Sequence, residues 1–188
     1  MKKTEITVQV FNSLEEIDKI LNSYGYKQTE TYQLNDWYFT KLQDVSNVKY
    51  LDLMNSSFLV RQVLGTNEEV KIVYKKKEVD GLGNVISEEK IQSYVNSLQK
   101  TIDIFKACGL NNYCVVKNTT YSYKKDEIAF DVQVIENLGI FIECEEFEKI
   151  KDLTEKQKIE YLTNFVKSLN LNIGTDYSCK KVLMLLKR

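Results

Sequence analysis

The sequence predicts an α+β domain in which an antiparallel sheet curls or closes and helices pack outside it. About eight segments have the alternation or β-branched and aromatic content of strands, against two or three with helical spacing. Residues 4–11 and 127–134 alternate, with one clean apolar face and one polar face. Helices with apolar stripes need a sheet face to cover, and the apolar strand faces suit them. The polar faces then look across a barrel lumen or out to water.

The first half of the chain is predicted as a strand, a helix and a run of further strands. Residues 4–11 form the first strand, with Glu5, Thr7 and Gln9 on its polar face. Ser13 opens a capping box with Glu16, and the helix that follows ends at Gly25. Aromatic and β-branched content predicts the next strands, and 80–84 is a hairpin signal. These strands are residues 33–41, 57–63, 69–76 and 88–95.

The second half is predicted to add two helices and three strands. A helix covers residues 97–108 and ends before Gly109. Strands at 114–123 and 127–134 form a hairpin around 125–126, and a further strand covers 139–147. A helix then begins at Thr154, and the last segment, 177–188, is apolar enough for either element, with helix favoured.

Composition points to one soluble domain over residues 1–188, placed in the cytoplasm. The chain has 26 Lys and Arg against 27 Asp and Glu, a net charge of −1, which argues against non-specific binding to nucleic acid or membranes. The opening residues 1–5 lead into no apolar stretch, and the longest apolar run is 182–186, so neither a signal peptide nor a membrane span is expected. The cysteines, at 108, 114, 144 and 179, form no C-x-x-C pair and suit free thiols.

Missing residue types narrow the chemistry. The chain has no histidine, which excludes a Ser-His-Asp triad, a histidine general base and a histidine-ligated zinc. Its seven glycines form no phosphate-cradling loop, since Gly81 and Gly83 are followed by Ile86 rather than glycine. Any phosphate chemistry must therefore use side chains and metal.

Charged residues recur at strand positions. Taken singly, each is typical of a solvated sheet face. Glu143 and Glu145 differ, because carboxylates at i and i+2 share one face, repel each other, and suit a hard divalent cation. The acids are Glu5, Asp36, Asp131, Glu143 and Glu145, and the cations are Arg61, Lys71, Lys75 and Lys117.

The order of these motifs resembles the CYTH domains, or triphosphate tunnel metalloenzymes, and particularly their class IV adenylate cyclase-like branch. The most specific match is the run 138–145, Leu-Gly-Ile-Phe-Ile-Glu-Cys-Glu. The other matching segments follow in family order along nearly the whole chain. They are residues 5–9, 36–39, 59–61, 73–75, 116–119, 130–131 and 177–178.

The resemblance implies an eight-stranded antiparallel barrel whose tunnel binds a triphosphate with Mg²⁺ or Mn²⁺. Carried over by position, Glu5, Glu143 and Glu145 would bind metal, and Asp131 would be a supporting acid. Arg61, Lys75 and Lys117 would bind the triphosphate of a nucleotide or an inorganic polyphosphate. The motifs single out no catalytic residue, and a homodimer is compatible with them. Transfer of phosphoryl or nucleotidyl groups needs mainly positioning and neutralisation of charge, which fits these residues.

The sequence departs from the family motifs at four positions. Thr7 and Gln9 replace a Glu and a Lys of the opening motif, and Leu59 and Thr119 each replace a cation. Three readings stay open: a metal-dependent enzyme that cyclises ATP or hydrolyses a triphosphate, a weakened relative that binds nucleotide or polyphosphate without efficient turnover, and a structural or interaction domain.

Overall fold

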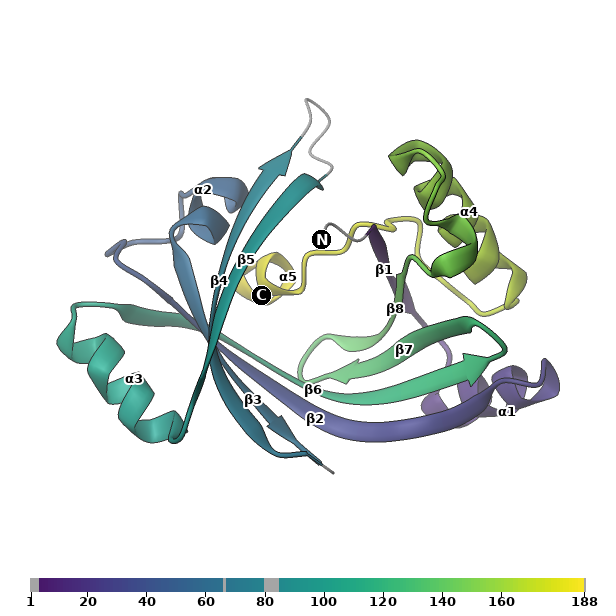
Figure 1. Ribbon diagram of the computed structural model, residues 1–188, viewed down its shortest axis with the longest axis horizontal. Coiled ribbons are helices and arrows are strands. Elements are labelled where there is room, and N and C mark those ends of the chain that lie inside the picture. The colour runs from purple at the N-terminus through teal and green to yellow at the C-terminus, as the bar shows by residue number, and fades with distance from the viewer. Residues whose placement is uncertain (1–3, 66, 80–84, 188) are drawn as a thin grey trace. The chain divides into compact units, whose positions relative to one another are not determined.

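The computed structural model describes residues 4–65, 67–79 and 85–187 (Figure 1). Its strands form one antiparallel sheet in the order β1-β8-β7-β6-β2-β3-β4-β5, which confirms the predicted α+β class. The strands are β1 (Glu5–Val10), β2 (Lys27–Thr40), β3 (Ser57–Leu64), β4 (Glu69–Val79), β5 (Val85–Val95), β6 (Asn111–Lys125), β7 (Ile128–Ile135) and β8 (Gly139–Glu145). The helices are α1 (Leu14–Ser23), α2 (Tyr50–Asn55), α3 (Leu98–Ala107), the 3₁₀ helix η1 (Glu148–Ile150), α4 (Glu155–Ser168) and α5 (Lys181–Leu186).

The chain forms two compact units whose division falls within β2 and β6. Unit 1 comprises Met1–Tyr32 and Asn118–Lys180, and unit 2 comprises Gln33–Lys117 and Lys181–Arg188. Closure of the sheet into a tunnel depends on how the two units are placed relative to each other, so it stays a prediction. The assignment of residues 1–188 to a single domain also stays a prediction.

Unit 1 buries the apolar face of its strands under α1 and α4. Val8, Val132 and Ile142 lie side by side on this face through the registers of β1, β8 and β7. The stripes of α1 (Ile17 and Leu21) and α4 (Leu162 and Val166) complete one core, in which these side chains are fully buried. Burying one such side chain contributes about 1.5–3 kcal/mol, so the core fixes which face of each strand is left for polar residues.

Both helices of unit 1 begin where the sequence predicts. Ser13 accepts a hydrogen bond from the backbone N–H of Glu16 while the Glu16 carboxylate accepts one from the Ser13 N–H, and Thr154 and Gln157 form the same reciprocal box. Each box satisfies two backbone donors that the helix itself leaves unpaired. Gly25, at φ +85°, takes the left-handed conformation after α1.

A strap from the C-terminal part of the chain covers the second edge of β1. This C-terminal strap (residues 172–179) hydrogen-bonds β1 along its length, with Tyr177 accepting from the Thr7 N–H at 3.0 Å and Cys179 donating to the Thr7 carbonyl at 3.1 Å. Gly174 donates to the Gln9 carbonyl at 2.9 Å. Because β8 pairs with the other edge, both edges of β1 are satisfied, and this strand is fixed in register with β8.

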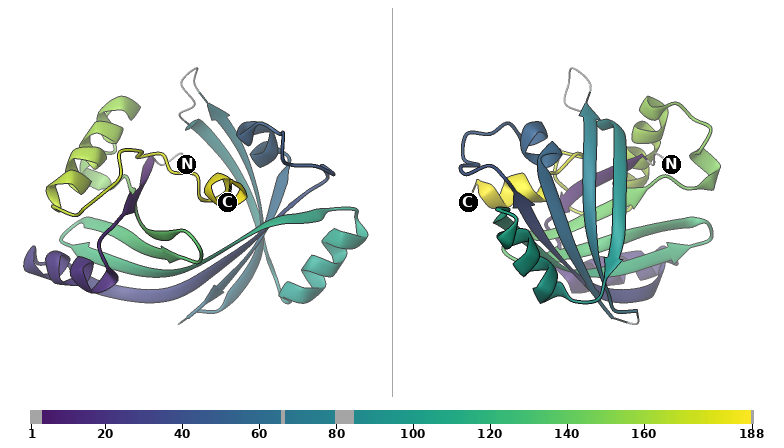
Figure 2. Two further views of the ribbon diagram at one scale, coloured as in Figure 1. Left: turned by 180° about the vertical axis from the view of Figure 1, so that it is seen from behind. Right: turned by 60° about the vertical axis from the view of Figure 1, so that its left-hand side comes forward.

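Unit 2 packs α3 against one face of β2 and β3. Phe39 on β2 and Val60 on β3, diagonal neighbours two positions apart in the register, are fully buried against Ile102 and Phe105 of α3. The Phe39 and Phe105 rings meet edge to face, with centroids 5.3 Å apart. Figure 2 shows β4 and β5 as long neighbouring strands, and Val70 to Val79 pair with Val95 to Val85.

Several boundaries differ from the prediction. The strand predicted at 33–41 begins at Lys27, and α2 was not predicted at all. The final segment is helical only from Lys181 to Leu186, with the strap before it. The predicted hairpin at 80–84 lies outside the described residues. Among the helices that the structure describes, none has the length and apolar character needed to cross a membrane; placement in the cytoplasm stays a prediction.

Candidate metal and phosphate sites

The polar face of unit 1 is assembled by cross-strand register. Glu5 lies opposite Glu145, Thr7 opposite Glu143, and Glu143 in turn opposite Asp131 on β7. Residues paired across antiparallel strands point to the same face, so these side chains lie on the face away from α1 and α4. The predicted metal-binding acids and the supporting acid are therefore neighbours on one surface of unit 1.

Three carboxylates on this face could hold one metal ion. Glu5, Glu143 and Glu145 each offer an oxygen, and these atoms lie within 4.8 Å of one another. Glu143 is half-buried and the other two are exposed. Mg²⁺ and Mn²⁺ prefer oxygen ligands, and these three carboxylates are held on two paired strands, so the residues fit a hard divalent cation.

Asp131 extends the acidic surface next to Glu143. Its carboxylate accepts a hydrogen bond from Ser122 Oγ at 2.6 Å and one from the Tyr32 hydroxyl at 3.4 Å. Burial and the nearby charge of Glu143 raise the pKa of Asp131 despite the Ser122 hydrogen bond. Burial and the Asp131 charge also raise the pKa of Tyr32 to about 12, which keeps its hydroxyl protonated as a donor. The charge of Glu143 beside Asp131 disfavours a second negative charge there and would be offset by a cation between the two carboxylates.

Thr7 and Gln9, which replace the charged residues of the opening motif, lie on this face but carry no charge. Thr7 is only 7% exposed, with Glu143 opposite on one side and the C-terminal strap on the other. Gln9 Nε2 donates to the Leu138 carbonyl at 3.2 Å and so supports the turn before β8. Both side chains are therefore integrated into unit 1 as polar but neutral residues.

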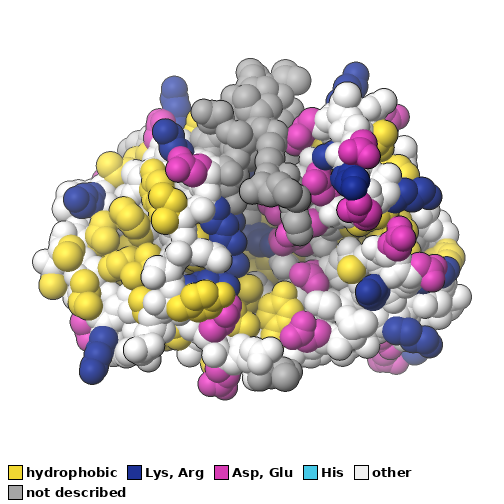
Figure 3. All heavy atoms as spheres, in the orientation of Figure 1, with side chains coloured by type: hydrophobic (Ala, Val, Ile, Leu, Met, Phe, Trp, Pro, Cys, Tyr) yellow, Lys and Arg dark blue, Asp and Glu magenta, His cyan; other side chains and the backbone are white. Residues whose placement is uncertain are grey.

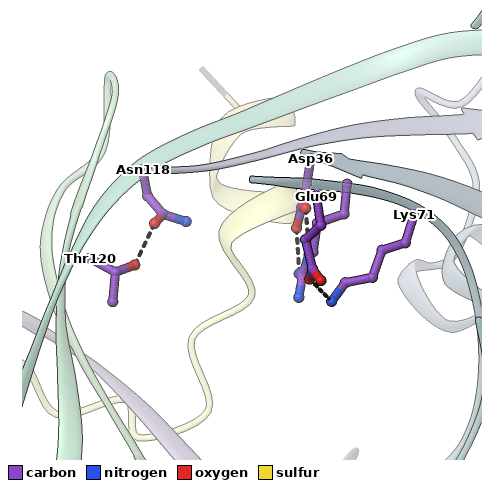
Figure 4. Close-up of polar contacts among 6 residues, drawn as sticks. Asp36, Glu69, Lys71, Asn118 and Thr120 are labelled. Atoms are coloured by element: carbon purple, nitrogen blue, oxygen red, sulfur yellow. Dashed lines mark hydrogen bonds and ion pairs between the residues drawn. The ribbon is translucent and has the colours of Figure 1, made fainter. Parts of the chain in front are cut away.

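Unit 2 has its own polar face, on the side of β2–β5 away from α3. Cross-strand pairing aligns Asp36, Arg61, Lys71 and Tyr94 in one row over four strands. Asp36, almost fully buried, binds Arg61 through two hydrogen bonds of 2.7 Å, from Nε and Nη2. Lys71 forms an ion pair with Glu69 (Figure 4). The two parallel hydrogen bonds from Arg61 to Asp36 fix the guanidinium plane of Arg61.

Lys75 lies further along the same face of β4. Residues 71, 73 and 75 alternate to one side of the strand, and Lys75 pairs across to Lys90 on β5. Leu59, where the family motif carries a cation, is buried on β3 beside Val73. The motifs missed Lys90, and they left Lys71 outside the predicted site although its parity matches that of Lys75.

Lys117 has a different setting from the other predicted cations. It is exposed, and alternation along β6 places its side chain, with that of Thr119, on the opposite face from Asn118 and Thr120. Asn118 and Thr120 are buried and bind each other, Thr120 Oγ1 donating to Asn118 Oδ1 at 2.7 Å (Figure 4). The structure thus brings Arg61 and Lys75 to one face of unit 2. Because Ser122, two residues after Thr120, lies opposite Asp131, the side chain of Lys117 points to the face of β6 away from the acids, contrary to the prediction that they share one face. The phosphate-binding roles stay predictions.

Comparisons with known proteins bear on the fold. No protein-family profile matches the chain. A Methanocaldococcus jannaschii protein named "Putative adenylate cyclase" is 28% identical over 102 residues, which are 54% of this chain and 56% of that protein. The chain therefore matches just over half of the length of this relative.

Solved structures align over nearly the whole chain. The PH1819 protein from Pyrococcus horikoshii OT3 has a TM-score of 0.72 at 18% identity, covering 100% of both chains. A Hippeastrum protein described as a "Putative adenylyl cyclase" with a dominant triphosphatase activity has a TM-score of 0.63 at 13% identity, covering 99% of this chain and 95% of that one. This chain accordingly has the fold of these solved structures, one of which is described as a putative adenylyl cyclase. The matches agree with the resemblance drawn from its motifs.

Proposed function

We propose that this protein is a metal-dependent enzyme that acts on a triphosphate, either by cyclising ATP or by hydrolysing the triphosphate. The observation that carries the proposal is the cluster of Glu5, Glu143 and Glu145 on two paired strands, with their carboxylate oxygens within 4.8 Å. Three carboxylates at this spacing repel one another unless a cation lies among them.

The metal and the cations have complementary roles in this proposal. Glu5, Glu143 and Glu145 would hold Mg²⁺ or Mn²⁺, which, when bound, neutralises charge on phosphate oxygens. Arg61 and Lys75, which share one face of unit 2, are proposed to bind the triphosphate, and Asp36 keeps the Arg61 guanidinium in one orientation. The role of Lys117 rests on the family motif alone, because its side chain lies on the other face of β6 from the residues beside the acids. Phosphoryl and nucleotidyl transfer depend mostly on such positioning and charge neutralisation.

The names of the relatives support the same reaction classes. The matched M. jannaschii protein is named for adenylate cyclase activity, and the Hippeastrum structure is described with a dominant triphosphatase activity. Cyclisation of ATP gives cyclic AMP and pyrophosphate, whereas hydrolysis uses water to give ADP and phosphate or AMP and pyrophosphate. Formation of cyclic AMP therefore distinguishes the two.

A second candidate function is binding of nucleotide or polyphosphate without efficient turnover. It is favoured by the neutral side chains of Thr7 and Gln9 and by the apolar, buried Leu59, all at positions where the family motifs carry charge. These residues reduce the charge available to the metal and to the phosphates.

Thermal unfolding with Mn²⁺, with tripolyphosphate and with both, followed by product analysis with ATP, tests the proposal. Ligands that bind only the native state raise the unfolding temperature. The enzyme reading predicts a joint shift together with cyclic AMP, or with phosphate or pyrophosphate. A shift without product indicates the second candidate. No shift and no product with any ligand would leave a structural or interaction domain.

A further inference from the structure

Unit 2 contains a pocket at the end of β3, β4 and β5 where Tyr94 lies. Its volume is about 440 Å³, within the range of pockets that hold small organic ligands. All of the residues that line it belong to unit 2, so the pocket is complete within that unit. They are Gln62, Val63, Leu64, Glu68, Glu69, Val70, Tyr94, Val95 and Asn96.

We propose that this pocket binds the nucleoside part of the substrate, with the base stacked on the Tyr94 ring. The inference rests on the proposed function and narrows its substrate class to nucleoside triphosphates rather than inorganic polyphosphate. Every base has a π-face, and stacking on an exposed aromatic side chain is the usual way in which proteins hold an unpaired base.

The Tyr94 ring is both accessible and held in place. It is 65% exposed, an unusual setting for a large aromatic side chain that lies on a strand. Lys71 Nζ lies 5.7 Å from the ring centroid, and the same ammonium is ion-paired with Glu69. A cation over an aromatic ring attracts it, so Lys71 fixes the ring while most of its surface stays open. Figure 3 shows further hydrophobic side chains over unit 2 on the face that it displays.

The charges along β4 give the ligand a direction. Glu68 and Glu69 line the pocket, and their carboxylates would repel a phosphate chain but can accept hydrogen bonds from base amino groups or ribose hydroxyls. Lys71 lies two residues further along the strand and Lys75 four residues beyond that, opposite Lys90. The acidic, aromatic end therefore suits a nucleoside, and the basic length of the strand suits its phosphates.

The pocket also offers a neutral polar group for the base edge. Asn96 lines it two residues after Tyr94, and a side-chain amide both donates and accepts hydrogen bonds. Because stacking tolerates any base, the choice among bases falls to this amide and the carboxylates.

Isothermal titration of ATP and of tripolyphosphate, each with Mn²⁺, into wild type and Tyr94→Ala tests the inference. We expect Tyr94→Ala to weaken ATP binding by roughly 5- to 150-fold, the range for loss of one base–aromatic stack, and to change tripolyphosphate binding by less than about twofold. Tyr94→Phe, which keeps the ring, should bind ATP like wild type. Ile91→Ala is the matched control, since Ile91, at 59% exposed, is similarly accessible on the same strand but points to the opposite face.

Each alternative result overturns the inference in a recognisable way. Equal ATP affinity in wild type and Tyr94→Ala would show that the base does not stack on Tyr94. An equal loss for both ligands would show that Tyr94 acts only by orienting Lys71 toward phosphate. If wild type binds neither ligand, the proposed function itself fails, whereas binding of both with no effect at Tyr94 leaves that function intact. Because Tyr94 is exposed, its truncation should leave folding unchanged, which circular dichroism verifies.

Discussion

Replacing Glu143 by Gln should reverse the order of stability of wild type and variant according to whether metal is present. Glu143 belongs to two of the three carboxylate pairs in the cluster formed with Glu5 and Glu145. Gln keeps the shape of the side chain but removes the charge that a hard cation requires. Without metal the variant should be the more stable protein, and with metal the less stable one.

The size of this effect follows from the spacing of the carboxylates. Two unit charges 4.8 Å apart repel by about 0.9 kcal/mol in water and by about 3.5 kcal/mol at an effective dielectric constant of 20. Since Glu5 and Glu145 are exposed, the lower value applies, and removing two pairs stabilises the metal-free protein by about 2 kcal/mol. Mn²⁺ at about 100 times its dissociation constant would stabilise wild type by about 2.7 kcal/mol, more than the repulsion it offsets.

Thermal unfolding in EDTA and in a series of Mn²⁺ concentrations measures both effects. For a chain of this size 1 kcal/mol corresponds to about 2–4 °C, so Glu143→Gln should unfold about 4–8 °C higher than wild type in EDTA. Wild type should gain about 5–11 °C with Mn²⁺ and the variant close to nothing. Glu127→Gln, an exposed acid in the β6–β7 turn of the same unit, is the control and should follow wild type. Equal Mn²⁺ shifts in wild type and Glu143→Gln would refute the metal assignment.

Three further perturbations separate the roles of the other residues. Lys75→Ala should weaken tripolyphosphate binding at least about tenfold in calorimetry because a charge-assisted contact is lost. Lys76→Ala, on the opposite face of the strand, should bind like wild type, and equal affinities of wild type and Lys75→Ala would remove Lys75 from the site. Thr7→Glu adds a carboxylate opposite Glu143 at a buried position, so it should lower the unfolding temperature in EDTA and enlarge the rise in unfolding temperature with Mn²⁺. A rise no larger than that of wild type would argue against a metal at Glu143. The pKa of Asp131 is raised in the folded protein, so its ionised form is disfavoured there. Wild type should therefore gain stability relative to Asp131→Asn as the pH falls from 7 toward about 4. A difference in unfolding free energy that does not change with pH would contradict this.

Local sequence patterns predicted the elements whose signals are local. The capping boxes at Ser13 and Thr154 and the alternation in β1 and β7 mark elements that the structure contains. The first six residues of β2 were missed because they are mostly exposed and polar and lack the alternation of a half-buried strand. Helix α2 is six residues long and its N-cap, Lys49, makes no side-chain capping bond, so its sequence carries no start signal.

In the candidate sites too, local spacing predicted some neighbours, while others depend on cross-strand register. The i, i+2 spacing of Glu143 and Glu145 places both on one face without further information. The position of Glu5 beside them depends on the register of β1 and β8, which are far apart in sequence, and only the family resemblance anticipated it. The pairing of Lys75 with Lys90 and the clamp of Asp36 on Arg61 likewise depend on registers that periodicity does not encode.

The most direct test of the central claim is the dependence of triphosphate turnover on divalent metal. Wild type incubated with ATP or tripolyphosphate should form product with Mn²⁺ or Mg²⁺, stop in EDTA, and resume when metal is restored, whereas Glu143→Gln should stay inactive at every metal concentration. Turnover that continues in EDTA, or that survives in Glu143→Gln with unchanged metal dependence, would contradict the assignment of Glu5, Glu143 and Glu145 as the metal site.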